Sequence, residues 1–433
     1  MANKPIKVLD TSALLDDPTI VRKIPNSRIV IPFATLKELD QKKSKQDEIG
    51  RNAREIIRIL DSLEGDISEG VAFEQNSTIE ILNIECKTNG KTVDEYIIET
   101  AKMLSQKEKD VCLISQDINM RVRAKSLKIK AEPILTNGFH GSTNLNPKIY
   151  TGIGEVELDD NDLNVFMSGK DKNINLTKYI NDKIEFYPNQ FLRISNDDTG
   201  STFGIIKIVD DKKILRTIKN YSHFKQLDCK PRNLEQNLAI NLMLDPSIHL
   251  VSLSGRAGTG KTLLALACAL YLQRTDKRRI IITKPTVPVG RELGFLPGSV
   301  EEKVNPYFGS IFDNLRFLIP DDNYLEDMIR SSEIEISPLQ LFRGRSLNNV
   351  LWLLDESQNT TKLEMKTLVT RAGENTKIFM TSDPEQIDTP YLDSFNNGAV
   401  YSIEKLKNSD IVGHVTLTKG ERSKLATLAA AEL

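Results

Sequence analysis

The sequence has little cysteine and no long apolar run. Its four cysteines, Cys86, Cys112, Cys229 and Cys268, lie far apart, and no CxxC pair suggests a zinc site, an iron–sulfur cluster or a redox dithiol. No stretch of roughly 18 consecutive apolar residues is present, and the N-terminus lacks the features of a secretory signal. We therefore expect reduced cysteines, no membrane partner and a cytoplasmic location.

The sequence also lacks an excess of charge of one sign. Lys and Arg number 58 and Asp and Glu number 60, so the net charge of −2 indicates no nucleic-acid or membrane partner, and any basic surface must be local. With 39% hydrophobic and 27% charged residues, the composition is that of a soluble globular protein. A chain of 433 residues exceeds what one hydrophobic core supports, which predicts several domains of α/β class.

From residue 6 to about 135, short apolar runs alternate with helical patterns, which predicts a parallel sheet covered by helices. Residues 136–150 are rich in Asn, Gly, Ser, Thr and Pro, so we place a linker there and the first domain at residues 1–145. The expected strands are Lys7–Asp10, Arg28–Phe33, Thr78–Ile84, Val111–Ser115 and Lys128–Ile134, and the longest expected helices are Asp47–Leu63 and Val93–Leu104.

Two further segments follow. Residues 146–225 contain short strand-like pieces separated by Asn, Asp and Gly, which predicts a small β-rich linker or insert. Alternating buried strands and helices return in residues 226–433, the expected third domain. The strands expected in these two segments are Gly154–Leu158, Ile184–Tyr187, Phe191–Ile194, Thr202–Val209, His249–Ser254, Arg279–Thr283, Asn349–Leu354 and Lys377–Thr381.

A Gly-rich loop joins the strand His249–Ser254 to the apolar helix Leu263–Leu272, which is the context of a P-loop. Glycines let backbone N–H groups surround a phosphate, Lys261 neutralises the β- and γ-phosphates, and Thr262 places a hydroxyl on Mg²⁺. The loop residues are Gly255, Arg256, Ala257, Gly258, Thr259, Gly260, Lys261 and Thr262. The pattern predicts a nucleoside-triphosphatase.

Two later strands bring polar residues to the same edge of that sheet. The apolar run 350–354 ends in Asp355 and Glu356, and ligands of parallel sheets bind at the carboxyl ends of strands. We expect Asp355 to hold Mg²⁺ through water and Glu356 to orient or deprotonate the attacking water. Gln386, which follows the strand Lys377–Thr381, is either a sensor of the γ-phosphate or a plain surface residue.

Six segments in order resemble the PhoH-like ATPases, relatives of superfamily 1 helicases, and this resemblance implies a RecA-like P-loop domain. They are GRAGTGKT (255–262), residues 283–315, DESQN (355–359), TRAG (370–373), SDPEQID (382–388) and GERSKLA (420–426). Lys284, Ser357 and Ser382 depart from the residues that the family usually has, namely Arg, Ala and Gly.

The resemblance implies further roles. It places the loop Pro285–Pro297 on the path of a nucleic-acid strand, with Arg291 for its phosphates, although an ordered surface loop is the alternative. It assigns Arg371 and Arg422 to the γ-phosphate, one of them from a neighbouring subunit of a homo-oligomer, expected to be a hexameric ring; either could instead form a structural ion pair. Gln236 falls where such motors have a glutamine that reads adenine.

Acidic residues of the first segment occupy strand and helix ends. Asp10 ends the first strand and Asp117 follows the fourth, so both lie at one edge of the sheet, while Glu38 and Asp94 lie on helices. Carboxylates gathered there repel one another unless divalent cations neutralise them. Two Mg²⁺ or Mn²⁺ ions could activate water for phosphodiester cleavage, which predicts a nuclease.

Four segments around these acids resemble the motifs of PIN-domain ribonucleases, joined to a PhoH-like motor as in PIN–PhoH fusion proteins. They are VLDTSALL (8–15), VIPFATLKELDQKK (30–43), VDEYIIETAKML (93–104) and LISQDINMRVRAKSL (113–127). The resemblance implies a PIN-like α/β sandwich whose metal ligands are Asp10, Glu38, Asp94 and Asp117, with Ser12 or Asn119 as polar support. Glu95 and Glu99 are close alternatives to Asp94.

Together these features predict an ATP-dependent RNA helicase or translocase coupled to a metal-dependent endoribonuclease. ATP and Mg²⁺ are the expected cofactors, with Mn²⁺ as an option at the nuclease site, and RNA is the expected partner. Two alternatives stay open. One is a nucleotide-switched RNA-binding ATPase with a catalytically silent first domain, and the other is a motor that acts on DNA.

Overall fold

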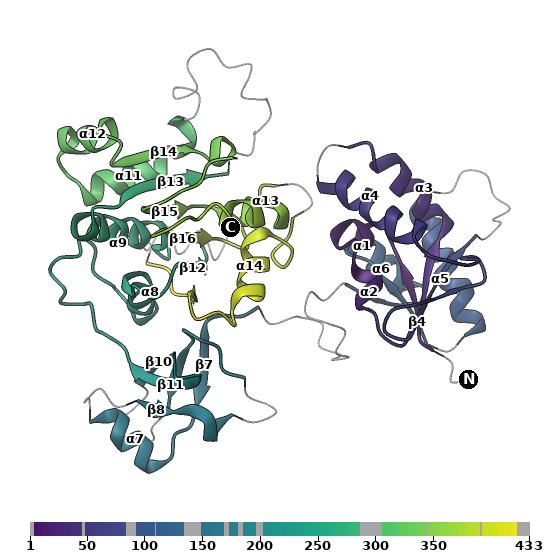
Figure 1. Ribbon diagram of the computed structural model, residues 1–433, viewed down its shortest axis with the longest axis horizontal. Helices are drawn as coiled ribbons and strands as arrows, with labels where there is room; N and C mark the ends of the chain where they lie inside the picture. The colour runs from purple at the N-terminus through teal and green to yellow at the C-terminus, as the bar shows by residue number, and fades with distance from the viewer. Residues whose placement is uncertain are drawn as a thin grey trace. The chain divides into compact units, whose positions relative to one another are not determined.

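The computed structural model describes residues 4–45, 48–83, 92–108, 110–133, 149–168, 173–180, 185–195, 202–285, 305–342, 344–389 and 392–421. It divides into two compact units, Met1–Pro147 and Lys148–Leu433. The expected α/β class is confirmed, with parallel strands dominating both units (Figure 1). None of the described helices has the length and apolar character needed to cross a bilayer.

The first unit is a six-stranded sheet in the order β3-β4-β2-β1-β5-β6, parallel except for the β3–β4 pair. One face is covered by α1 to α4 and the other by α5 and α6, so that neighbouring residues of β1 serve different cores: Leu9 packs on the first side and Val8 on the second. The strands are β1 Ile6–Leu9, β2 Arg28–Pro32, β3 Val71–Phe73, β4 Ser77–Leu82, β5 Val111–Ile114 and β6 Lys130–Glu132; the helices are α1 Thr11–Asp16, α2 Ile20–Lys23, α3 Phe33–Lys42, α4 Glu48–Asp61, α5 Val93–Lys107 and α6 Ile118–Ser126.

The second unit begins with a small sheet in the order β7-β9-β10-β11-β8, antiparallel except for the β7–β9 pair. Asp210 and Asp211, both at positive φ, form the tight turn between β10 and β11. A strand was expected at Ile184–Tyr187, but Glu185–Tyr187 do not form one. The Tyr187 N–H donates to the Gln190 side chain at the start of a turn and so does not pair with another strand. Ile184 lies outside the described residues. The elements are β7 Ile153–Val156, α7 Asp160–Met167, β8 Ile174–Asn175, η1 Leu176–Tyr179, β9 Phe191–Ile194, β10 Thr202–Val209 and β11 Lys212–Thr217.

The rest of the second unit is a six-stranded, fully parallel sheet in the order β14-β13-β15-β16-β12-β17. Alternate residues of β15 serve two cores: Leu351 and Leu353 pack with α8, α9, α11 and α12, and Trp352 packs with α13 and α14. The strands are β12 Leu250–Gly255, β13 Arg279–Lys284, β14 Ile334–Pro338, β15 Val350–Leu354, β16 Lys377–Ser382 and β17 Val412–Leu417; the helices are α8 Leu234–Leu244, α9 Lys261–Asp276, η3 Asn305–Phe308, α11 Gly309–Leu318, α12 Asp322–Arg330, η4 Leu339–Phe342, η5 Ser357–Asn359, α13 Lys362–Val369 and α14 Gly398–Leu406.

Direct polar contacts fix the small sheet to the large one. The Asn189 side chain, buried beside β9, donates to the carbonyls of Asp410 and Val412 at 2.7 and 2.9 Å, at the start of β17. Lys207 of β10 forms an ion pair of 2.6 Å with Asp245, which ends α8. We call these contacts the seam.

Candidate nucleotide and metal sites

The phosphate loop runs from the end of β12 to the start of α9, as expected. Gly258 and Gly260 have φ of 84° and 87°, a backbone conformation that is strained for any residue with a side chain. Gly260 is the residue directly before α9. At Gly255 a Cβ would lie 2.2 Å from the Leu417 carbonyl oxygen, so the close approach of β17 excludes any larger residue. The Lys261 ammonium is buried over the loop and donates to the carbonyls of Gly255 and Arg256 at 2.5 and 3.0 Å.

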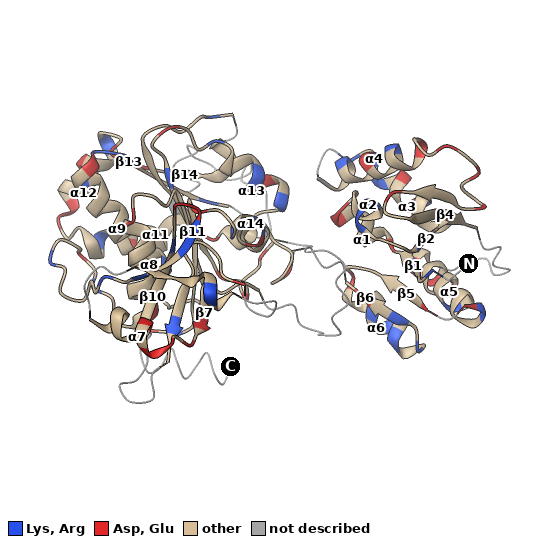
Figure 2. Ribbon diagram, turned by 60° about the horizontal axis from the view of Figure 1, so that its bottom comes forward, with Lys and Arg blue, Asp and Glu red and all other residues tan. Residues whose placement is uncertain are grey.

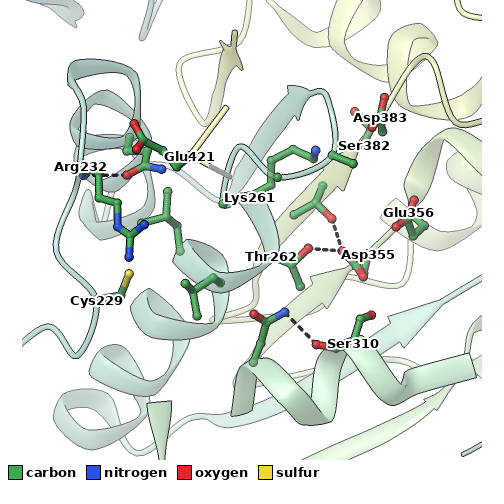
Figure 3. A pocket seen from close by; sticks show the side chains of 18 of the residues that line it. Cys229, Arg232, Lys261, Thr262, Ser310, Asp355, Glu356, Ser382, Asp383 and Glu421 are labelled. Carbon is green, nitrogen blue, oxygen red and sulfur yellow. Dashed lines mark hydrogen bonds between the residues drawn. The ribbon is translucent and has the colours of Figure 1, made fainter. Parts of the chain in front are cut away.

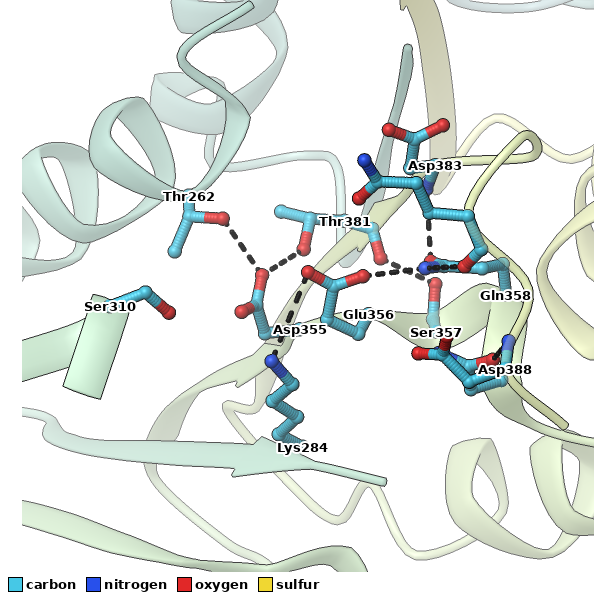
Figure 4. A network of polar contacts seen from close by, with 12 residues as sticks. Thr262, Lys284, Ser310, Asp355, Glu356, Ser357, Gln358, Thr381, Asp383 and Asp388 are labelled. Carbon is cyan, nitrogen blue, oxygen red and sulfur yellow. Dashed lines mark hydrogen bonds and ion pairs between the residues drawn. The ribbon is translucent and has the colours of Figure 1, made fainter. Parts of the chain in front are cut away.

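Asp355 lies at the carboxyl end of β15 and is held by two hydroxyls (Figure 4). Thr262 at the start of α9 and Thr381 of β16 both donate to its Oδ1, at 2.8 and 2.5 Å. The carboxylate is buried, so these two hydrogen bonds fix its orientation. The sequence assigned Thr262 and Asp355 each to a Mg²⁺ site, and it did not indicate Thr381 as a partner of Asp355.

Glu356 follows in the left-handed conformation, with φ of 52°. Burial raises the pKa of its carboxyl, the neighbouring charge of Asp355 raises it further, and Gln358, Lys284 and Lys261 oppose the rise. The Gln358 amide donates to Glu356 at 2.5 Å, and the Lys284 ammonium lies 3.9 Å from the same carboxylate. A carboxylate with a raised pKa beside a phosphate loop is suited to accept a proton from water.

Gln358 connects the ends of two strands. Its Nε2 also donates to the Gln386 carbonyl at 2.8 Å, and its Oε1 accepts from the Asp383 N–H at 2.9 Å. Sequence reasoning named Gln386 and missed Gln358. The structure brings Gln386 to the site through this main-chain contact.

A cavity of about 330 Å³ lies over the loop (Figure 3). Among the described residues, Lys261, Thr262, Asp355, Glu356 and Gln386 line one part of it, which is the phosphate side. Another part is lined by residues that precede or begin α8, namely Cys229, Lys230, Arg232 and Gln236. The volume and the polar lining are those of a ligand site.

Gln236, the expected adenine-reading residue, is buried beside the loop. Its Oε1 accepts from the Arg232 N–H at 2.7 Å, and its Nε2 donates to the Thr259 carbonyl at 3.0 Å. The amide therefore connects the segment before α8 to the phosphate loop, and reading adenine would require one of these bonds to be exchanged.

The segment after β17 also touches the loop. The Glu421 N–H donates to the Gly258 carbonyl at 2.9 Å, and Asn233, the N-cap of α8, donates to the Glu421 carboxylate at 2.7 Å. Glu235 in the first turn of α8 accepts the N–H groups of Thr418 and Lys419 at 2.7 and 3.0 Å. Arg422 follows directly, but it lies outside the described residues, as do Arg291 and residues 286–304.

Arg371 is at the other end of the large sheet. Its carbonyl accepts from the N–H of Leu347, which precedes β15, at 2.9 Å, whereas the phosphate loop lies at the carboxyl ends of the strands. The position of its backbone therefore favours the alternative in which Arg371 acts on a neighbouring subunit. Its Nε is buried, with no hydrogen-bond partner in the described part of the chain. A role at a neighbouring subunit stays a prediction.

In the first unit, Asp10 is buried at the end of β1 and caps α1. Its Oδ1 accepts from the Thr11 N–H, and its Oδ2 accepts from the hydroxyls of Ser12 and Ser115, each at 2.6 Å. Burial raises the pKa of Asp10, these hydrogen bonds lower it, and the charge of Asp94 raises it. The expected support from Ser12 is present, and Ser115, one residue past β5, is an addition that the sequence reading missed.

The other three acids act on one another. Burial raises the pKa of Asp94, and the negative charges of Glu38 and Asp117 raise it further. Asp117 caps α6 through the N–H groups of Asn119 and Met120, so Asn119 contributes its backbone. Glu95, the alternative to Asp94, is engaged by the Thr92 N–H in a capping box.

The structure thus brings Asp10, Glu38 and Asp117 within electrostatic reach of Asp94. No three Asp, Glu, His or Cys side chains in the described ranges are close enough to hold a metal ion as they stand. An all-carboxylate set nevertheless fits a hard divalent cation, since such an ion would relieve the repulsion at Asp94.

Comparison with known proteins covers both units. The family of PIN domains matches residues 7–134, and the family described as PhoH-like protein matches residues 228–429. Protein PhoH2 of Bacillus subtilis is 38% identical over 98% of this chain and 99% of its own length. Protein PhoH2 of Thermobispora bispora is 31% identical over 97% and 94%, and Protein PhoH2 of Mycolicibacterium smegmatis is 30% identical over 97% and 95%.

Proposed function

The chain belongs to the PhoH2 family, and from this premise we propose that it couples an ATP-driven RNA helicase or translocase to a metal-dependent endoribonuclease. The observation that carries the proposal is Asp355, fixed by Thr262 and Thr381 at the mouth of a P-loop in the same chain as the four acids of the PIN unit.

At the nucleotide site, the loop N–H groups and Lys261 bind the β- and γ-phosphates of ATP. Thr262 and Asp355 would hold Mg²⁺, which when bound would neutralise negative charge on the phosphates. Glu356 accepts the proton of the attacking water, a role that its raised pKa favours.

At the carboxylate site, Asp10, Glu38, Asp94 and Asp117 would hold Mg²⁺ or Mn²⁺, which when bound activates water against a phosphodiester. Ser12 and Ser115 keep the Asp10 carboxylate in one orientation through two hydrogen bonds. Asp117 keeps its place because it caps α6.

A catalytically silent PIN unit is the second candidate. It is favoured by the hydrogen bonds that already occupy both oxygens of Asp10 and by the spacing of the described acids. It predicts RNA affinity that depends on nucleotide, without cleavage.

We include a homo-oligomer, a hexameric ring, in the proposal. The backbone of Arg371 lies at the amino ends of the strands, so a contact between this arginine and a γ-phosphate would be made with that of a neighbouring copy. Light scattering that finds only monomer with full ATPase activity would contradict this part.

The deciding experiment incubates labelled structured RNA with the protein, with and without ATP, in Mg²⁺ or Mn²⁺, and with DNA of the same sequence as competitor. Asp10→Asn should abolish cleavage and spare ATP hydrolysis, and Lys261→Ala should do the reverse. Loss of both activities in either variant argues against two sites. ATP hydrolysis without cuts identifies the silent platform, and stronger stimulation by DNA identifies a DNA motor.

A further inference from the structure

Helix α6 and the residues that follow it carry charge of one sign. Between Ile118 and Lys130 the chain has five cations and no Asp or Glu, although the whole protein is nearly neutral. Figure 2 shows this basic helix in the first unit. The cations are Arg121, Arg123, Lys125, Lys128 and Lys130.

Part of this charge is used by the fold. Arg121 donates to the Ser115 carbonyl at 2.8 Å, and Lys130 pairs with Glu132 at 3.0 Å. Arg123 forms a loose, exposed pair with Glu95 at 3.7 Å, which contributes little to stability. Lys125 and Lys128 are exposed, and across the described ranges neither forms an ion pair.

Large aliphatic side chains lie among these cations. Ile118 and Val122, one helical turn apart, are 60% and 59% exposed, and Leu127 is 45% exposed. The opposite side of α6 already supplies Met120 and Ala124 to the core, and the three exposed side chains are not among the residues of that core. Cations in the last turn stabilise the helix dipole, but this effect requires neither Lys128 nor the exposed aliphatic groups at the first turn.

The basic helix borders the carboxylates. It begins at Asp117, one of the four acids, and the charge of Arg123 acts on Asp94, a second one. The basic segment therefore runs from this cluster of acids to Lys125 and Lys128, two cations without an ion pair in the described part of the chain. Such an arrangement fits a polyanion that has one phosphate group among the acids and its neighbours along α6.

We propose that the exposed residues Ile118, Val122, Arg123 and Lys125 of α6, with Leu127 and Lys128 directly after it, bind single-stranded RNA beside the nuclease site. This inference rests on the proposed ribonuclease function. The cations bind consecutive phosphates, and the aliphatic side chains cover base faces, which are accessible only where the RNA is unpaired. The surface thereby selects loops and single strands for cleavage.

The test uses the full-length protein and the double variant Lys125→Gln, Lys128→Gln. Binding of labelled single-stranded RNA is measured over a salt series in an Asp10→Asn background, and cleavage kinetics are measured without that substitution. Since each phosphate contact on a single strand contributes about 0.7 to the slope of log K against log salt, the slope should fall by about 1.4. The KM for cleavage should rise several-fold while kcat stays unchanged.

A matched control removes the same charge elsewhere. Arg51 and Arg58 are exposed on α4, which packs on α1 and α3, whereas α6 packs on α5 and β6. The variant Arg51→Gln, Arg58→Gln should leave slope and KM unchanged. Because the second unit is identical in both variants, their difference reports on the first unit alone.

A second variant, Ile118→Ser with Val122→Ser, should lower affinity for single-stranded RNA but not for a duplex of the same sequence. An unchanged slope and KM in the lysine variant would overturn the proposal, and so would a fall in kcat alone, which would mean that α6 only positions Asp117. If the lysine variant loses RNA affinity but the wild type never cleaves, the ribonuclease function fails and the binding surface stands. If the wild type cleaves RNA but the lysine variant keeps its RNA affinity, the binding surface is wrong and the ribonuclease function stands.

Discussion

The two groups of acids, one in each unit, differ in how their negative charge is balanced. In the second unit, two hydroxyls hold Asp355, and the cations Lys284 and Lys261 counter the raised pKa of Glu356. In the first unit, Asp94 has Glu38 and Asp117 as neighbours, and Arg123 is the cation that opposes them. The nucleotide site is thus prepared for a ligand that brings negative charge, and the PIN site for one that brings positive charge.

The largest expected effect is on ATP hydrolysis and comes from a substitution at Glu356 in the second unit. Glu356→Gln removes the proton acceptor but keeps the size of the side chain, so ATP hydrolysis should fall by about 10²–10⁴-fold while ATP binding persists. Single-turnover hydrolysis and nucleotide binding measure the two steps. Glu385→Gln, at an exposed acid that pairs with Arg256, is the control and should change little. Hydrolysis at the wild-type rate would exclude the role of Glu356.

The next effect tests the need for cations in the first unit. Asp94→Asn removes a carboxylate whose pKa is raised by its acidic neighbours, so the metal-free protein should become slightly more stable. The affinity of the variant for Mn²⁺ should fall by at least about 10–100-fold, which is the loss that removal of an outer-shell partner of a metal ligand causes. Thermal unfolding with Mn²⁺ or a chelator measures both effects. Glu64→Gln, at an exposed acid, should behave as wild type; a variant that Mn²⁺ still stabilises fully would contradict a metal site here.

A smaller effect compares the two supporting hydroxyls directly. Ser115 donates to Asp10 and Thr381 donates to Asp355. A hydrogen bond to a charged group contributes about 1.5–3 kcal/mol, so Ser115→Ala should reduce RNA cleavage roughly tenfold, and Thr381→Val should do the same to ATP hydrolysis. Each variant is assayed for both activities. Equal losses of both activities would mean general destabilisation rather than local support.

The smallest effect concerns a cation buried at the other end of the large sheet. Burial lowers the pKa of Lys377 to about 7, and its ammonium donates to the Asp245 carbonyl at 2.6 Å. Since this pKa lies below that of the unfolded chain, the folded state binds fewer protons above pH 7, and stability should rise with pH from 7 towards 10. Chemical unfolding at pH 7 and pH 9 should show a gain of about 2 kcal/mol that Lys377→Met abolishes. Lys405→Met, at an exposed lysine, should retain the gain.

Much of the fold could be predicted because buried parallel strands form continuous apolar runs. β9 and β10 have the predicted ends, and β15 and β16 shift by one residue at a terminus. The strands β14 and β17 were missed for a physical reason: IEISP and VGHVTL interrupt their apolar residues with polar ones and glycine, and their pairing comes from neighbours distant in sequence.

The candidate sites were predictable where a short motif contains the chemistry, as in the loop 255–262 and the acids at strand ends. Ser115 and Thr381 were not, since hydroxyls after strands are common and only the β1–β5 and β15–β16 pairings bring them to Asp10 and Asp355. For Arg371 the sequence could not decide between its own and a neighbouring phosphate loop, because order along the sequence does not tell which end of a sheet a loop occupies.

The seam makes the small sheet and the phosphate loop mechanically continuous. The Asn189 side chain donates hydrogen bonds to carbonyls at the start of β17. β17 pairs with β12 along its length, and the last pair, Leu417 with Gly255, lies where the phosphate loop begins. A load on the small sheet, such as a tethered strand being pulled, would therefore be transmitted through one pair of strands to the residues that surround the phosphates. The rate of nucleotide turnover would then depend on the load on the small sheet.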